Sequence, residues 1–336
     1  MSGKEYWASR AIFIARLVAM LAMTIAPVRA SDLHVRLLCA NRSCFERPDG
    51  AAPLSQRRLR HRVAVFSDNP KTIHDPRHPQ SQTGAHKMFA PIGLISSNHR
   101  VPHQYGAISK LHFDTGTAFL VSPCYVLTAY HVVFGNGPSE PEADQDYSMT
   151  FSVHGKTSRA VPAKFGEFYR YEGRDWALLR LDPDAEHRCL GEDPRTGWVR
   201  LARLSSHAAK HQSLSLAGYP SDKDASSLWR QDTCHLFHRL SGKRSRGLWT
   251  TDCATRPRAS GSPIFFVRHG VLNVVAIMHG HIGVVVGNEI LPKWNPRRAN
   301  LAVDIGDIIS SNPDFLKLID ADIARFHHPN PAAGRP

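Results

Sequence analysis

Short apolar or alternating runs recur between turn residues from about Phe89 onward, and this pattern predicts a series of short β-strands. In the first half of the region the runs are Pro91–Ser96, Ala107–Phe113, Gly116–Val121, Tyr125–Val133, Ser148–Gly155 and Trp176–Asp182. In the second half they are Ser213–Pro220, His235–Gly242, Gly247–Asp252, Pro263–Val267, Val271–Gly280 and His281–Val286. The lack of long segments with helical periodicity between them argues against an α/β fold. About a dozen strands are too many for one small barrel, so we predict an all-β fold of two six-stranded antiparallel β-barrels with a cleft between them.

One helix is expected after the last strands, within residues 304–325. Asn312 directly before Pro313 favours a helix start. Four apolar residues then fall on one helical face: Phe315, Leu316, Ile319 and Ile323. We predict a C-terminal helix and, over residues 323–336, a disordered tail.

The N-terminus has the pattern of an export signal. Lys4, Arg10 and Arg16 precede the apolar run Leu17–Ala26, which is too short for a membrane span and typical of a signal-peptide core. Small residues in Val28–Ala30 predict cleavage at the end of that triplet. We therefore predict a bacterial signal peptide over residues 1–30 and a secreted or periplasmic protein, with a single membrane anchor as the alternative.

Residues 31–88 are rich in Arg, Pro, His, Ser and Asp and contain few apolar runs. This composition is typical of a pro-segment or of an extended N-terminal arm. The basic cluster Arg57–Arg62 fits a processing site or a solvated run of charge. The folded domain is expected over residues 89–322, with the first barrel at about 89–195, the second at about 196–305 and the helix after it.

The formal net charge of +13 is high for 336 residues. Such a charge suits nucleic acid or an anionic surface, but the sequence has no basic helix and no alternation of aromatic with basic residues. We expect the charge to serve solubility and general affinity for anions, and we expect no specific nucleic-acid partner.

The six cysteines fit an exported chain with three disulfides. Pairing of nearest neighbours favours bridges at Cys39–Cys44, Cys124–Cys189 and Cys234–Cys253. Zinc is the weaker alternative, because the sequence contains no CxxC spacing. We predict no metal and no cofactor.

Three residues carry the candidate chemistry. A serine hydroxyl becomes a good nucleophile when a base takes its proton, and that base is usually a histidine oriented by a carboxylate. His131 ends the apolar stretch VLTAYH, Asp175 directly precedes WALLRL, and Ser260 lies in the turn RASGSP. Each motif alone is common in ordinary turns, but their order places His131 and Asp175 in the first predicted barrel and Ser260 in the second. The site would then lie in the cleft between the barrels.

These motifs resemble those of the trypsin-like (chymotrypsin-fold) serine endopeptidases. The matching stretches are GTAFLVSPCYVLTAYHVV, RDWALLRL, LAGYP and RASGSPIF, in this order. The segment TDCATRPRASGSP and the late NLAVDI are closest to the exported bacterial branch that includes the glutamyl endopeptidases. The resemblance implies that His131 is the general base and acid, Asp175 its orienting carboxylate and Ser260 the nucleophile.

The resemblance also implies an oxyanion hole made by the backbone N–H groups of Ser260 and of Arg258, a position that is normally glycine. If the loop needs a positive φ there, a side chain costs about 1 kcal/mol. We expect an active enzyme that tolerates the arginine, and the alternative is a damaged site or one completed only when substrate binds. Ala259 replaces the aspartate with which animal members bind a new N-terminal amine, so a pro-segment here would have to inhibit sterically or assist folding.

The resemblance further implies a specificity pocket. Ala254 at its floor lacks the carboxylate that cleavage after Lys or Arg requires, and Thr255 matches a pocket threonine of the glutamyl endopeptidases. Their pocket histidine aligns with Met278 without a gap, or with His279 after a one-residue shift. His281 falls where a glycine usually lets the substrate backbone pair. Acidic specificity is one prediction, and metal binding by His279 and His281 is a weaker one.

The leading prediction is an exported serine endopeptidase that acts on proteins or peptides through an acyl-enzyme. We expect a monomer without a membrane span once the signal is removed. One alternative is a catalytically impaired protease homologue that acts as a binding protein. Another is a basic protein whose N-terminal arm contacts an anionic polymer.

Overall fold

A computed structural model describes thirteen stretches of the chain, which include most of the region from 75 to 327. The described residues are 38–40, 43–45, 65–66, 75–80, 86–101, 110–134, 148–163, 170–171, 175–224, 226–240, 247–281, 290–291 and 299–327. The chain divides into one unit of residues 1–39 and 44–57 and another of residues 40–43 and 58–336, and the candidate site belongs to the latter.

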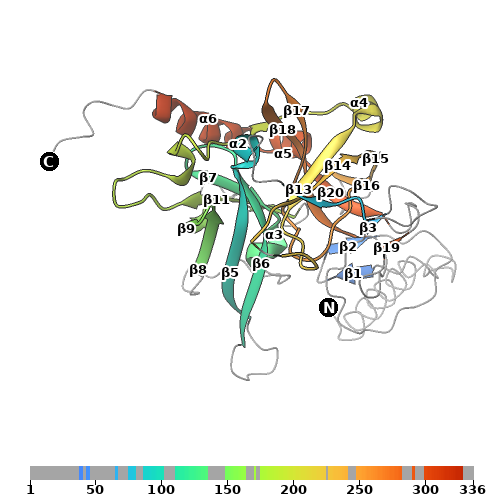
Figure 1. Ribbon diagram of the computed structural model, residues 1–336, viewed down its shortest axis with the longest axis horizontal. Coiled ribbons are helices and arrows are strands. Elements are labelled where there is room, and N and C mark those ends of the chain that lie inside the picture. Colours follow the sequence, from blue (N-terminus) through green and yellow to red (C-terminus); the bar gives the residue numbers. More distant parts are fainter. Residues whose placement is uncertain are drawn as a thin grey trace, which may run out of the picture. The chain divides into compact units, whose positions relative to one another are not determined.

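The first part of the domain is a closed barrel of six antiparallel strands, drawn from teal to green in Figure 1. The strands run in the order β11-β7-β6-β5-β8-β9, and pairing of β11 with β9 closes the ring. Their bounds are β5 (Ile92–Val101), β6 (Lys110–Leu120), β7 (Tyr125–Thr128), β8 (Ser148–Val153), β9 (Lys156–Pro162) and β11 (Trp176–Leu181). β10 (Arg170–Tyr171) adds to this sheet by pairing with β11.

Apolar side chains from every strand of the ring fill this barrel. In β11 every residue is buried except Arg180, as expected for the sequence WALLRL in a strand that is covered on both faces. β8 and β9 are joined by a tight turn at His154-Gly155, where both residues have the positive φ that such hairpins require (48° and 72°). The barrel predicted for the first half of the domain is confirmed.

The second part is a nine-stranded sheet, drawn from yellow to orange in Figure 1 apart from the blue β4. Its main path is β15-β16-β20-β18-β17-β13-β14-β4, and β12 pairs with β18 in parallel. The bounds are β4 (His78–Pro79), β12 (Arg200–Leu201), β13 (Leu214–Gly218), β14 (Trp229–Cys234), β15 (Leu236–Arg239), β16 (Leu248–Thr251), β17 (Pro263–Arg268), β18 (Val271–His281) and β20 (Asn300–Asp304).

The second sheet differs from the predicted second barrel. Among the described strands, no pairing joins its two ends, so the ring seen in the first sheet has no counterpart here. Register shifts in β13, β17 and β18 bend the sheet instead. β4, which was expected to belong to an arm outside the folded domain, forms its edge strand beside β14.

Short pairings and helices complete the fold. β1 (Leu38–Ala40) pairs with β2 (Ser43–Phe45), and β3 (Val65–Phe66) pairs with β19 (Ile290–Leu291). The short helical elements are α2 (His86–Phe89), α3 (Tyr130–Phe134), the 3₁₀ turn η2 (Leu190–Glu192) and α4 (Ser206–His211).

The predicted C-terminal helix is two helices, α5 (Ile305–Ser311) and α6 (Pro313–His327). Asn312 lies between them, and both its backbone N–H and its side-chain amide donate to the carbonyl of Ile308, so it ends α5. Phe315 and Ile319 are buried as predicted. α6 continues to His327, past the boundary predicted at residue 322.

α6 packs on the first barrel. Phe315 contacts Trp176 edge to face, with ring centroids 5.5 Å apart. Asp322 is buried and accepts hydrogen bonds from the hydroxyl of Ser122 and the N–H of Cys124, both at 2.8 Å. The C-terminal helix therefore stabilises the barrel that lies earlier in the sequence.

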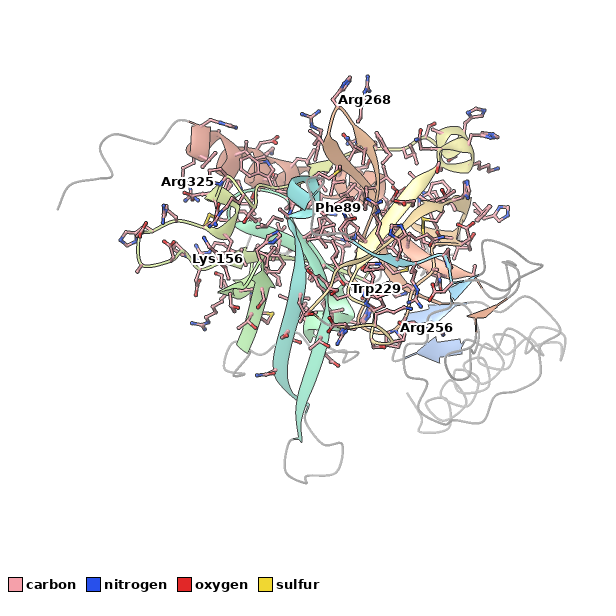
Figure 2. The ribbon with its side chains drawn as sticks, viewed as in Figure 1. Phe89, Lys156, Trp229, Arg256, Arg268 and Arg325 are labelled. Carbon is pink, nitrogen blue, oxygen red and sulfur yellow. A yellow bond between two sulfur atoms is a disulfide. The ribbon has the colours of Figure 1, made fainter. Side chains whose placement is uncertain are left out.

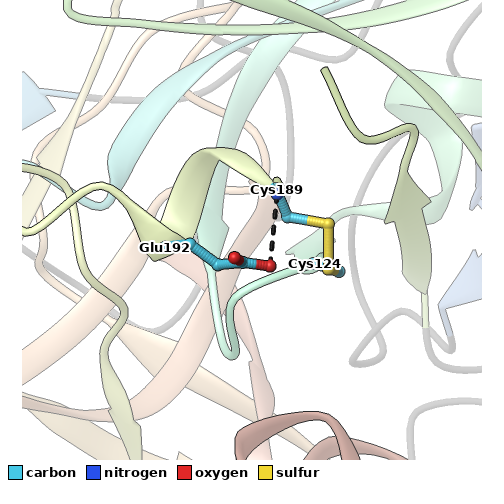
Figure 3. Close-up of side chains that lie close together, drawn as sticks. All are labelled: Cys124, Cys189 and Glu192. Atoms are coloured by element: carbon cyan, nitrogen blue, oxygen red, sulfur yellow. Dashed lines mark hydrogen bonds between the residues drawn. A yellow bond between two sulfur atoms is a disulfide. The ribbon is translucent and has the colours of Figure 1, made fainter. Parts of the chain in front are cut away.

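Two of the predicted disulfides are formed, Cys124–Cys189 and Cys234–Cys253. Figure 3 shows the first beside Glu192, whose carboxylate accepts a hydrogen bond from the backbone N–H of Cys189 at 3.3 Å. The side chains of Cys39 and Cys44 lie outside the described residues, so that bridge stays a prediction.

The predicted signal peptide at residues 1–30 and the basic cluster at 57–62 also lie outside the described residues. Within the described part of the chain, none of the helices has the length and apolar character needed to cross a membrane.

Replacing Cys124 and Cys189 together by alanine should lower the free energy of unfolding by about 4 kcal/mol, because the bridge joins residues separated by 65 positions. The same change at Cys234 and Cys253, separated by 19 positions, should lower it by about 3 kcal/mol. Denaturant unfolding followed by tryptophan fluorescence measures both values. The reverse order would show that loop closure is not the main contribution of these bridges.

Candidate active site

His131 and Asp175 meet beside the barrel. His131 lies in α3, the single helical turn that follows β7, and Asp175 directly precedes β11 with a left-handed φ of 52°. The ring N–H at Nδ1 of His131 donates to Oδ2 of Asp175 at 2.7 Å, and the backbone N–H of His131 donates to Oδ1 at 2.8 Å. Both side chains are about nine-tenths buried, at 10% and 8% exposed. The carboxylate thus fixes the ring and leaves Nε2 of the neutral imidazole to accept a proton.

The electrostatics favour an ionised carboxylate beside a basic histidine. Burial alone would lower the pKa of the His131 imidazole, but the charge and hydrogen bond of Asp175, with a smaller contribution from Asp114, raise it above 6.5. Burial alone would raise the pKa of Asp175, but the charges and hydrogen bonds of His131 and His279 hold it well below its usual range. The pair therefore stabilises the fold near neutral pH. The stability that His131 contributes is lost as pH rises through the raised pKa of its imidazole. The stability that Asp175 contributes is lost as pH falls below the usual pKa range of an aspartate.

His279 is a second histidine on the same carboxylate. Its Nδ1 hydrogen-bonds to Oδ2 of Asp175, and its ring lies edge to face with that of His131 at a centroid distance of 5.9 Å. The side chain is 4% exposed. The structure thus places His279 beside the candidate triad, whereas the sequence resemblance placed it in the specificity pocket.

Ser260 lies against the same group of residues. Its hydroxyl donates to the carbonyl oxygen of His279 at 3.5 Å, the outer limit of a hydrogen bond. A Cβ atom at Gly116 would lie 2.5 Å from Val132 of α3 and 3.0 Å from the carbonyl oxygen of Ser260. Glycine at this position of β6 therefore lets the helical turn that carries His131 and the loop that carries Ser260 approach the same strand.

The Ser260 loop (residues 256–262) has two residues in the left-handed region, Arg258 with φ 74° and Gly261 with φ 87°. At Gly261 a side chain is excluded, because a Cβ atom would lie 2.0 Å from the carbonyl oxygen of Thr117. Arg258 adopts the conformation that glycine adopts freely and that an L-residue adopts at a cost of about 1 kcal/mol. The loop thus keeps a glycine-like backbone at the position where the sequence has arginine.

The guanidinium of Arg258 is held by three backbone carbonyl groups. Nε donates to Tyr219 at 3.0 Å, and Nη2 donates to Pro220 at 3.1 Å and to Lys223 at 3.3 Å. Hydrogen bonds from a charged donor contribute more than neutral ones. These contacts offset the cost of the left-handed backbone.

The backbone N–H groups of the Ser260 loop differ in whether they donate a hydrogen bond within the protein. Ala259, Gly261 and Ser262 each donate to a carbonyl oxygen of the protein. For the N–H groups of Arg258 and Ser260, the described residues provide no acceptor. Unpaired backbone N–H groups are rare in a folded protein away from water, so these two are the available donors for a bound anion or oxyanion.

The remaining residues predicted for the pocket occupy different surroundings. Ala254 and Thr255 are buried, and the N–H of Ala254 donates to the side-chain oxygen of Gln231 at 2.5 Å. Met278 belongs to the apolar core of the second sheet. The side chain of His281 lies outside the described residues.

Three side chains that could bind a metal ion lie close together here. They are His131, Asp175 and His279, and one potential ligand atom from each lies within 4.8 Å of the others. The Nδ1 atoms of His131 and His279 are already hydrogen-bonded to the carboxylate of Asp175. A metal ion at this point would have to replace both of those hydrogen bonds.

Sequence reasoning missed the contacts that support the loop. Thr117 hydrogen-bonds to it, Tyr219 accepts from Arg258, and His279 shares Asp175 with His131. The position of His279 in AIMHGHIG was the one available signal, and it indicated a different role. Thr117 and Tyr219 lie within the recognised motifs, but nothing in those motifs predicts their hydrogen bonds.

The fold and the site define a class: a closed β-barrel contributes a histidine bonded to a buried aspartate, and a second sheet contributes a serine in a tight, glycine-like loop. This is the arrangement of the trypsin-like serine proteases. The model of the trypsin-like peptidase domain family matches residues 116–277, which include His131, Asp175 and Ser260. The protein therefore has a trypsin-like serine protease fold, and residues 116–277 are similar to that domain family.

Two solved structures are similar to the chain. A Glu endopeptidase in complex with MPD is 14% identical, with a TM-score of 0.46, and the alignment covers 76% of this chain and 100% of that one. The inactivated protease paralogue S-I1 of the scabies mite is 16% identical, with a TM-score of 0.43, over 71% of this chain and 99% of that one. No curated protein matches the chain.

Asp175→Asn should lower the pKa of the His131 imidazole, because the substitution removes the charge that raises this pKa and leaves the burial that lowers it. An NMR titration of the histidine ring protons, assigned with His131→Gln, measures the shift. Asp184→Asn, in an exposed turn, is the matched control and should change nothing at His131. An unaltered titration of His131 in Asp175→Asn would contradict this assignment of the cause.

Proposed function

We propose that this protein is an exported serine endopeptidase whose catalytic residues are Ser260, His131 and Asp175. The observation that carries the proposal is the hydrogen bond from Nδ1 of His131 to the buried carboxylate of Asp175, in the stretch that matches the trypsin-like peptidase domain family. This bond selects the tautomer whose Nε2 accepts a proton.

The reaction divides into two acyl transfers. Oγ of Ser260 attacks the carbonyl carbon of the scissile peptide bond, and its proton moves to Nε2 of His131. Asp175 stays ionised and stabilises the imidazolium. The C–N bond then breaks as His131 gives its proton to the leaving amine, which leaves an acyl-enzyme on Ser260. Water attacks this ester with His131 again as the base, which restores the serine and releases the acid.

The oxyanion of each tetrahedral intermediate would accept hydrogen bonds from the N–H groups of Arg258 and Ser260. The glycine-like φ of Arg258 and the lack of another acceptor for either N–H among the described residues support this role. A donor of this kind contributes about 100- to 1000-fold to turnover. The arginine is thus compatible with an active site, because it changes the side chain and not the direction of the backbone.

Export is proposed from the apolar N-terminal run with its preceding basic residues, and the disulfides Cys124–Cys189 and Cys234–Cys253 support it. For specificity, Ala254 provides no carboxylate for a basic substrate side chain. Thr255 and His281 remain the candidates for binding an acidic substrate side chain, since the ring of His279 is hydrogen-bonded to Asp175.

A fluorophosphonate probe should label Ser260, because such probes react with serines that a neighbouring base activates. Mass spectrometry of the mature, disulfide-bonded protein should locate the label on this residue. Labelling should disappear in Ser260→Ala and in His131→Ala and persist in Ser213→Ala, a control at an exposed serine. Folded protein that takes up no label would favour the alternative, an impaired homologue that acts as a binding protein.

The pH dependence of activity provides a separate test. Activity requires neutral His131, so kcat/KM should rise with pH around a midpoint above 6.5, because Asp175 raises the pKa of that imidazole. The profile is measured with a peptide substrate identified from a cleavage library. A midpoint below 6.5 would contradict the role of Asp175 in raising this pKa, and a profile without a rising limb would contradict the assignment of His131 as the base.

A further inference from the structure

Residues 75–80 of the N-terminal segment are built into the second sheet. β4 pairs with β14, with Pro79 opposite Trp229, which is labelled in Figure 2. The N–H of Gln80 donates to the carbonyl of Leu228 at 2.8 Å. An added edge strand of this kind ties the segment to the domain through main-chain hydrogen bonds.

Arg77 in this segment is buried, with a side chain only 3% exposed. Its guanidinium donates to both carboxylate oxygens of Asp222, at 2.9 and 2.6 Å. It also donates to both oxygens of Asp75, at 2.9 and 2.7 Å. Bidentate pairs of this type are strong and fix the geometry of both partners.

Asp222 belongs to the Tyr219 loop (residues 219–224), which is the first part of the connection from β13 to β14. A second ion pair joins the segment to this loop, because Nζ of Lys223 lies 3.2 Å from Oδ2 of Asp75. Nζ of Lys223 also lies 4.5 Å from the centre of the Trp229 ring. The ion pairs between Arg77 and Asp222 and between Asp75 and Lys223 therefore fix the Tyr219 loop to residues 75–80.

The same loop holds Arg258. Its carbonyl groups at Tyr219, Pro220 and Lys223 accept all three described hydrogen bonds of the Arg258 guanidinium. Its N–H at Ser221 donates to the carbonyl of Pro257 at 2.7 Å. The Tyr219 loop thus contacts the two residues whose peptide unit determines where the N–H of Arg258 points.

The charges around Asp222 favour this arrangement. Arg256, labelled in Figure 2, has a side chain 3% exposed, and its Nε lies 3.8 Å from Oδ2 of Asp222. Burial would raise the pKa of Asp75, but the hydrogen bonds and charge of Arg77, with a contribution from Lys223, lower it to about 2. The Asp75–Arg77 pair therefore stays charged throughout the neutral range.

We propose that Arg77 is a positioning residue for the oxyanion hole: it fixes the Tyr219 loop through Asp222, and this loop holds Arg258 in its glycine-like conformation. Residues 75–80 are thus a permanent part of the active protein and not a removable inhibitor. Processing at the basic cluster 57–62 would leave Arg77 in place. The inference rests on the proposed function for its effect on catalysis, but its structural part is independent of it.

Arg77→Ala tests this directly in the full mature protein. Loss of the Arg77 side chain should raise amide hydrogen exchange at Tyr219, Ser221 and Lys223 of the Tyr219 loop and at Ala259, whose N–H groups are hydrogen-bonded. It should lower kcat with little change in KM, since the oxyanion forms only in the transition state. We expect a loss of about 10- to 100-fold, below the 100- to 1000-fold that loss of a whole donor costs. Arg77→Lys, which keeps the charge without the planar fork, should be intermediate.

Arg268→Ala is the matched control, because this arginine lies at the exposed end of β17. It should leave both readouts at their wild-type values. If Arg77→Ala does not fold, Asp222→Asn removes the charge that Arg77 binds at nearly constant size and provides the same readouts. Unchanged exchange in the Tyr219 loop in a folded variant would overturn the positioning role.

The two readouts separate the proposals. A wild-type protein that neither cleaves peptides nor takes up the fluorophosphonate probe would refute the proposed function, while the exchange data would still decide whether Arg77 fixes the loop. The N-terminus of the labelled protein isolated from culture medium provides a further check. It should precede Asp75, and a labelled protein that begins after Gln80 would overturn the claim that the segment is retained.

Discussion

The contact between Thr117 of β6 and the Ser260 loop joins the two sheets at the candidate site. The backbone N–H of Thr117 donates to the carbonyl oxygen of Ser260 at 2.9 Å, and the Thr117 hydroxyl donates to the carbonyl oxygen of Arg258 at 3.2 Å. The same hydroxyl accepts from the N–H of Tyr219 at 3.1 Å. Since His131 and Asp175 belong to the barrel that contains β6, Thr117 helps to determine how the serine lies relative to its proposed base, together with His279, which contacts both Asp175 and Ser260.

Arg258 shows how a residue that departs from a family pattern can keep the backbone conformation of that pattern. Glycine reaches the left-handed region at no steric cost, and an arginine reaches it only when other contacts offset the strain. Here those contacts are the carbonyl groups of the Tyr219 loop, which Asp222 in turn joins to the buried Arg77. The arginine at this position of the Ser260 loop is therefore explained by residues that are distant in sequence.

The sequence predicted the features that are encoded locally. The apolar runs located β5, β6, β7, β8 and β11 of the first barrel, although β6 was predicted as two strands and β9 was not predicted. The order of His131, Asp175 and Ser260 indicated the candidate site. It did not predict that the second sheet lacks a closing pair or that Asn312 divides the C-terminal helix, because both depend on packing between distant elements. Arg77 carried no signal, since its partner Asp222 is 145 residues away. His279 was assigned to the pocket because the motif alone does not determine which way its ring turns.

The crystal structure of the fluorophosphonate adduct is the most direct test of the account. We predict phosphonylation of Ser260, with the phosphoryl oxygen at about 2.7–3.1 Å from the backbone nitrogen atoms of Arg258 and Ser260. The φ of Arg258 should remain in the left-handed region. An adduct whose phosphoryl oxygen does not contact the N–H of Arg258, or a peptide unit that points this N–H away from the cleft, would contradict the central claim.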